Sequence, residues 1–195
     1  MIKTLSVPAV VIGTLTMGCS KDASSSEPPG ASQGNEAPPV PAIGTVPVTK
    51  LSDDQIANIV VTIDTGEIEQ AQIALYRTSD ASVRAFATQM LEEHTKAKQA
   101  GVRLATDSTV GLAVSPKSRE LQAQSQQVIA RLNDADGSKF DKTYLDSQIE
   151  QHAEVLNLLN DQLIPAATLV ALRNYLKDAR RMVQRHLEHA RELQK

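Results

Sequence analysis

Four polar side chains, Glu67, His94, His152 and His186, each interrupt an apolar helical stripe, and all four are of types that bind metal ions. His94 belongs to a stripe whose members alternate in spacing between four and three residues: Val83, Ala87, Met90, His94, Ala97, Gly101 and Leu104. That spacing is typical of the inward face of a bundled helix. Glu67 and His152 interrupt two further stripes of the same kind. Two imidazoles and one carboxylate suit zinc or iron(II), so the sequence predicts a metal site formed by Glu67, His94 and His152.

Five helical segments are expected to position these residues, at about 52–76, 80–104, 117–133, 139–162 and 165–195. Aromatic residues make up only 3% of the chain, and an aliphatic core with few rings suits packing of helix on helix. The third segment has a thin apolar stripe, so we expect it to lie on the surface and to carry the chain from one end of the bundle to the other. The predicted fold is all-α, a ferritin-like four-helix bundle with an additional crossover helix.

Residue counts along these helices predict which polar side chains lie at one height. With the crossover in place, Glu67, His94 and His152 fall within roughly 5 Å of a common level. His186 interrupts the stripe of the last segment. Counted from Pro165 as the start of that helix, His186 lies about 13 Å away from the others. We therefore expect His186 to lie apart and to hydrogen-bond Tyr144 or Asp141.

Two interpretations of these polar residues remain open. Met90, one turn from His94, would add a soft ligand and shift the preference toward copper. Alternatively, buried histidines and a glutamate only fix the packing of the helices. The Glu-x-x-His motif of di-iron bundles is missing, because Leu91 and Ile149 stand three residues before His94 and His152. The sequence thus favours a non-enzymatic protein with a zinc, iron or copper ion as its candidate cofactor.

The N-terminus predicts export and a lipid anchor. A short positive start is followed by a mostly apolar run over 4–18 and then by Cys19, the only cysteine of the chain. This arrangement resembles the lipobox of bacterial lipoproteins, with Thr16 at the position that usually holds leucine. In such proteins the cysteine is lipidated, and multiple acyl chains give stable membrane anchoring. Ser20, rather than aspartate, follows the cysteine and favours the outer membrane, with the protein facing the periplasm.

Composition divides the chain into three parts. We predict a signal peptide over 1–18, a lipidated Cys19 with a Ser/Pro/Gly-rich tether over 19–50, and the helical domain over 51–195. The formal net charge is −3, and no basic patch with interleaved aromatic residues is present, which argues against nucleic acid as a partner. The first predicted helix is acidic and the last is basic, so the basic face of the last helix is a candidate surface for a protein partner.

Several short motifs resemble the bacterial domain of unknown function 4142. They are Glu67-Ile-Glu with Ala74, Val83-Arg-Ala-Phe-Ala-Thr-Gln-Met90, Glu93-His94-Thr95, Phe140-Asp141-x-x-Tyr144, His152 and His186-Leu187. The resemblance implies a ferritin-like fold, inward-facing histidines and an envelope location, and it implies no established reaction. Glu93 and Gln151 stand where the family usually has aspartate before a histidine, and the proline that the family usually carries ahead of the last histidine is missing.

These observations support two hypotheses about function. The first is a membrane-tethered envelope bundle that binds a transition metal for storage, sensing or stress protection. The second is a non-catalytic module of the envelope whose buried His and Glu residues only specify packing.

Overall fold

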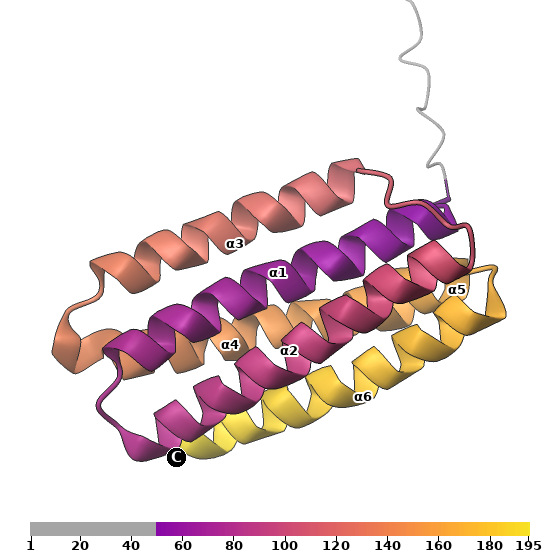
Figure 1. Cartoon of the computed structure of the whole chain (residues 1–195). Coiled ribbons are helices and arrows are strands. Elements are labelled where there is room, and N and C mark those ends of the chain that lie inside the picture. The colour runs from indigo at the N-terminus through magenta and orange to yellow at the C-terminus, as the bar shows by residue number, and fades with distance from the viewer. Residues whose placement is uncertain (1–49) are drawn as a thin grey trace, which may run out of the picture. The chain divides into compact units, whose positions relative to one another are not determined.

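The computed structural model describes residues 50–195, which form helices joined by short connections (Figure 1). The predicted signal peptide, Cys19 and the tether lie outside the described residues. The helices have these bounds: α1 Asp53–Arg77, α2 Ala81–Asp107, α3 Pro116–Asp134, α4 Gly137–Leu158, the π-helix η1 Leu159–Leu163, α5 Ile164–Ala166 and α6 Val170–Leu193. Residues 50–195 contain no strand, so the prediction of an all-α bundle is confirmed.

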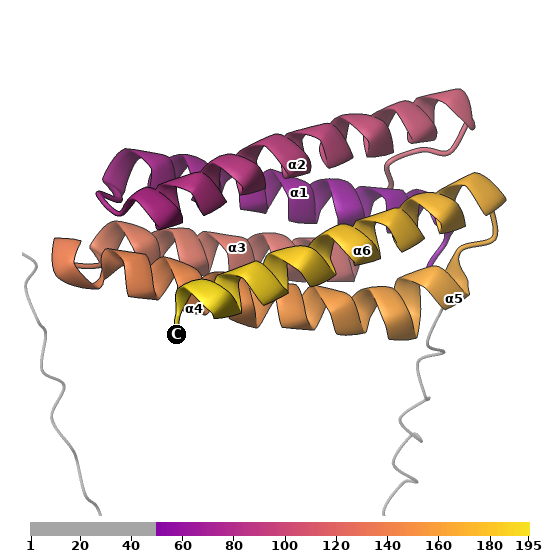
Figure 2. The ribbon, with the colours of Figure 1, turned by 90° about the horizontal axis from the view of Figure 1, so that it is seen from below.

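The chain order gives the bundle its connectivity. α1 and α2 lie antiparallel, α3 returns the chain to the end where α2 begins, and α4 and α6 form the second antiparallel pair (Figures 1 and 2). α3 packs on α1 and α4 at the edge of the bundle, as its thin apolar stripe predicted. The four long rods α1, α2, α4 and α6 with a crossover helix have the connectivity of ferritin-like bundles.

A polar layer divides the interior of the bundle. One apolar cluster lies toward the end where α6 begins and is built from residues such as Ile56, Leu159 and Leu172. The other surrounds Phe86 and Tyr144. Between them lie buried polar side chains from four helices: Asp64, Glu67, Gln70, His94, Gln148, His152 and His186. Burying polar groups costs free energy unless they are paired, so a buried polar layer of this size indicates a functional role.

Side-chain caps set the helix ends and so the register of the layer. Ser52 forms a capping box with Gln55 at the start of α1, and Asp80 accepts hydrogen bonds from the first turn of α2. α6 lacks a cap of its own at Leu169, and Asp53 of α1 supplies it instead. The Asp53 carboxylate accepts hydrogen bonds from the Thr168 amide at 2.8 Å, the Thr168 hydroxyl at 2.6 Å and the Leu169 amide at 2.8 Å.

The end of the fourth rod differs from the sequence prediction. Pro165 was expected in the first turn of the last helix, but it lies in α5, which continues α4 through η1. Proline lacks an N–H and its ring clashes with the preceding turn of a regular α-helix. The wider π-turn of η1 directly before it relieves that conflict. The last helix therefore begins at Val170, five residues later than Pro165.

Candidate metal centre

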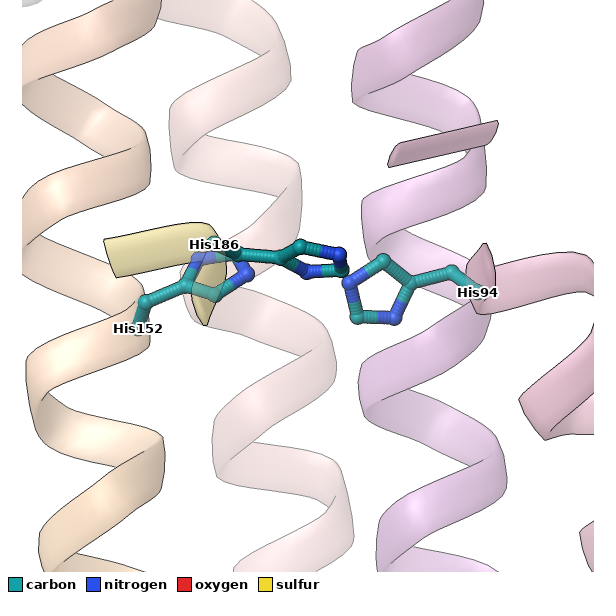
Figure 3. A group of neighbouring side chains, drawn as sticks. All are labelled: His94, His152 and His186. Atoms are coloured by element: carbon teal, nitrogen blue, oxygen red, sulfur yellow. The ribbon is translucent and has the colours of Figure 1, made fainter. Parts of the chain in front are cut away.

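Three histidines from three helices meet in the polar layer. His94 comes from α2, His152 from α4 and His186 from α6, and their rings face one another (Figure 3). Ring centroids are 5.7 Å apart for His94 and His152, 5.1 Å for His94 and His186, and 5.4 Å for His152 and His186. Their exposed fractions are 1%, 2% and 0% in chain order.

The prediction that His186 lies apart was wrong, and the start of the last helix explains the error. The fourth rod continues to Ala166, and α6 starts only at Val170. His152 is 14 residues before Ala166, and His186 is 16 residues after Val170, so the two residues lie at nearly equal distances from the same end of the bundle. At about 1.5 Å per residue the difference is roughly 3 Å.

One nitrogen of each imidazole is held by a hydrogen bond from outside the cluster. His94 Nδ1 donates to Asp64 Oδ1 at 2.9 Å, and His152 Nδ1 donates to the carbonyl of Gln148 at 2.9 Å. His186 Nε2 donates to Glu93 Oε2 at 3.2 Å. Histidines that bind metals are typically oriented in this way by a carboxylate or a backbone carbonyl, which fixes the tautomer.

The remaining nitrogen of each ring is buried and has no hydrogen-bond partner among residues 50–195. These atoms are Nε2 of His94, Nε2 of His152 and Nδ1 of His186. One ligand nitrogen from each histidine lies within 4.8 Å of the other two. Three imidazole nitrogens on a tetrahedral zinc ion are about 3.3 Å apart, so each ring has to move inward by no more than about 1 Å to bind an ion.

Two of the three rings prefer the neutral form, which has a lone pair for a cation. Burial lowers the pKa of His152 well below its ordinary value, and the charges of His94 and His186 lower it further. Burial also lowers the pKa of His186, to about 4, with a contribution from the charge of His94. Both rings are therefore neutral at pH 7, the form that binds metals.

His94 has the opposite preference. Burial alone would lower its pKa, but the hydrogen bond to Asp64 and the charges of Glu67, Asp64 and Glu93 outweigh burial and raise the pKa. The carboxylates that favour a proton on this ring also favour a metal ion in front of it, since both are cations. The carboxylates of Asp64, Glu67 and Glu93 thus make the surroundings of the histidines favourable for a cation.

Glu67 lies in the polar layer as predicted, with an exposed fraction of 3%. Its Oε1 is 4.0 Å from His152 Nδ1, which already donates to Gln148. Its Oε2 has no hydrogen-bond partner in the described part of the chain, and burial raises the pKa of the carboxyl. The cluster of potential ligands contains the three histidines without Glu67, so a role for Glu67 as a ligand stays a prediction.

The secondary candidates are placed as follows. Met90 is fully buried in the apolar cluster around Phe86, and its role as a soft ligand stays a prediction. The expected hydrogen bond from His186 to Tyr144 or Asp141 is wrong, because His186 donates to Glu93. The Tyr144 hydroxyl and Asp141 Oδ1 are buried without a partner within 50–195. Burial raises the pKa of Tyr144 well above its ordinary value.

Sequence reasoning missed the carboxylates that orient the rings. Asp64 stands three residues before Glu67 and therefore on the same face of α1, a signal that could have found it. Tyr175 of α6 donates to the carbonyl of Ala97 at 3.0 Å and approaches Asp64 Oδ2 at 3.4 Å. Glu93 precedes His94 directly and points to a different helix, where Arg185 also binds it at 3.2 Å. No spacing rule predicts that cross-helix contact.

The fold and the polar layer define a helical-bundle protein with three buried, convergent histidines. The family model "Domain of unknown function (DUF4142)" matches residues 38–193, and the chain belongs to this family. No curated protein and no solved structure matches it significantly. Between residues 50 and 195, no helix is both long and apolar enough to cross a membrane.

Proposed function

We propose that this protein binds one transition-metal ion through His94, His152 and His186. The observation that supports this most concerns the two nitrogens of each ring. One nitrogen forms a hydrogen bond to a group outside the cluster, and the other is buried without a partner within residues 50–195. One nitrogen of each ring also lies within 4.8 Å of those of the other two. Buried polar atoms without partners are rare and costly, and a single cation would satisfy all three at once.

The three imidazole ligands limit which metal ions suit the site. Three neutral imidazoles suit zinc, iron(II) and copper better than magnesium or calcium, which prefer oxygen ligands. The surrounding carboxylates Asp64 and Glu93 balance the charge of a dication without occupying its coordination sphere. Three protein ligands leave a fourth position for water, another small molecule or Glu67.

The proposed setting is the cell envelope. The lipobox-like sequence ending at Cys19 and the Ser/Pro/Gly-rich stretch after it support a lipid-anchored domain at the outer membrane that faces the periplasm. A buried site of this kind suits holding a metal for storage or protection against metal stress.

Metal analysis of the full-length chain, purified without a histidine tag, tests this proposal. After dialysis with zinc, iron(II) or copper and removal of excess ion, we expect one equivalent of metal per chain. His94→Ala and His152→Ala should lose it while circular dichroism shows the helices retained. His189→Ala is the matched control, because His189 contacts Gln89 outside the cluster. Wild-type protein that retains none of the three metals would leave the second hypothesis, a packing module.

A further inference from the structure

A small chamber lies beneath α3 and reaches the polar layer at Glu67 and Gln70. Its volume is about 30 Å³, room for a single water molecule. Its wall includes Gly66 and Glu67 of α1, Ser125 of α3, and Gln151 and Glu154 of α4. Glu67 lies between this chamber and His152, because it lines the chamber and its Oε1 is 4.0 Å from His152 Nδ1. Its side chain is 3% exposed, and its Oε2 has no hydrogen-bond partner in the described region.

Surface clefts lie on both sides of the helix that covers the chamber. The cleft between α1 and α3 has a volume of about 280 Å³ and shares Gly66 and Ser125 with the chamber wall. The cleft between α3 and α4 has a volume of about 290 Å³ and shares Gln124 and Glu154 with it. The exposed Glu154 belongs to the wall of both the chamber and the α3–α4 cleft, so the chamber approaches the surface at this cleft.

The groups along this route favour a cation. The α3–α4 cleft carries Glu120, Glu154 and Asp161 against one lysine, Lys117, which pairs with Glu120 at 3.0 Å. A cleft lined mainly by one sign of charge raises the local concentration of the opposite ion. Further in, the amide groups of Gln70 and Gln151 line the chamber and bond each other at 2.9 and 3.0 Å. Both amide oxygens are thus occupied, whereas Glu67 Oε2 has no hydrogen-bond partner in the described residues, and a carboxylate oxygen can replace water around a cation.

α3 is suited to moving aside. Its buried residues are only Ser118, Val128 and Leu132, and Ser125 faces the chamber through a long 3.5 Å contact with Gln70. Segments with few buried apolar contacts open at low free-energy cost. At the closest approach, a Cβ placed on Gly66 would lie 2.9 Å from Ser125 Cβ, so only glycine lets α3 close over α1 here.

The other approach to the histidines is less suited to a cation. Glu93 is partly exposed next to His186, but its Oε2 already accepts from His186 and from Arg185, both at 3.2 Å. Its other oxygen accepts from Gln89 at 3.0 Å. A cation that approaches from this side is repelled by the Arg185 guanidinium, and both oxygens of the Glu93 carboxylate are already occupied by hydrogen bonds.

We propose that the chamber beneath α3 is the access route of the metal ion and a transit site with oxygen ligands. In this proposal, which rests on the proposed function, Glu154 attracts the hydrated dication, α3 moves outward, and Glu67 Oε2 receives the ion before the three histidines bind it.

Stopped-flow mixing of the full-length, metal-free chain with cobalt(II), followed by the visible absorption of the bound ion, tests the route. Glu154→Gln should slow association roughly threefold and weaken its dependence on salt, with the equilibrium affinity unchanged. Glu150→Gln is the matched control, since Glu150 is an exposed glutamate one turn earlier on α4 that lines none of the three cavities.

A second pair of variants tests the movement of α3. Gly66→Ala should speed association, because the added methyl group holds α3 away from α1, and Gly66→Ala with Ser125→Gly should restore the wild-type rate. Equal rates in Glu154→Gln and Glu150→Gln, or faster loading only in Arg185→Gln, would overturn the route and leave the metal site intact. Failure of the wild-type chain to bind cobalt(II), zinc, iron(II) or copper would instead overturn both proposals.

Discussion

The lowered pKa of His186 makes a quantitative prediction about the metal-free protein. The ring titrates near pH 6.5 in an unfolded chain but has a pKa of about 4 in the folded state, chiefly because it is buried. Between these values the unfolded chain binds more protons than the folded one, so the free energy of unfolding falls as the pH is lowered. Linkage with these two pKa values gives a loss of about 2 kcal/mol between pH 7 and pH 5 from this residue.

The variant His186→Gln isolates that contribution. Glutamine can still donate a hydrogen bond to Glu93 but does not titrate. Urea unfolding in the presence of a chelator, followed by circular dichroism at pH 7, 6 and 5, measures the free energy of unfolding for both chains. We expect wild type to lose about 2 kcal/mol more than the variant over this range.

His189→Gln serves as the control for His186→Gln. His189 lies three residues further along α6, is only partly buried and contacts Gln89 rather than the cluster. The control should keep the wild-type dependence on pH. If wild type and His186→Gln lose stability in parallel as the pH falls, the ring is not held neutral by its surroundings, and the electrostatic account of the site is refuted.

Two further substitutions test how the fold supports the site. Asp64→Asn should weaken zinc affinity by about 10- to 100-fold with the helices retained, because the amide orients His94 less well than the carboxylate and carries no charge. Competition with a coloured chelator measures the affinity, and an unchanged value would show that Asp64 does not support the site. Asp53→Ala should lower the free energy of unfolding by about 1–2 kcal/mol in urea, since the first turn of α6 loses its cap, whereas an unchanged value would show that water replaces the three hydrogen bonds.

The fold could be predicted because its signals are local. Periodic apolar stripes, caps and breaks located every long helix, and the length of the segment between the second and fourth helices indicated the crossover. The error at Pro165 came from treating proline as a helix start, whereas a π-turn lets the preceding helix continue through it. That shift of a few residues moved His186 out of the predicted site.

The candidate site could be predicted only in part. His94 and His152 were brought together correctly because their heights depend on helix counts from shared turns. The partners Asp64 and Glu93 could not be assigned in the same way, because each contact depends on the rotation of one helix against another and on a side-chain rotamer. A polar layer between two apolar clusters is a tertiary feature that periodicity in a single helix does not reveal.

X-ray absorption at the zinc edge of the loaded full-length chain tests the central claim most directly. We expect a first shell of nitrogen and oxygen atoms at about 2.0 Å with the outer-shell scattering of three imidazoles, reduced to two in His186→Gln. A shell of oxygen atoms alone, or an imidazole count that does not change in His186→Gln, would contradict a metal centre built from His94, His152 and His186.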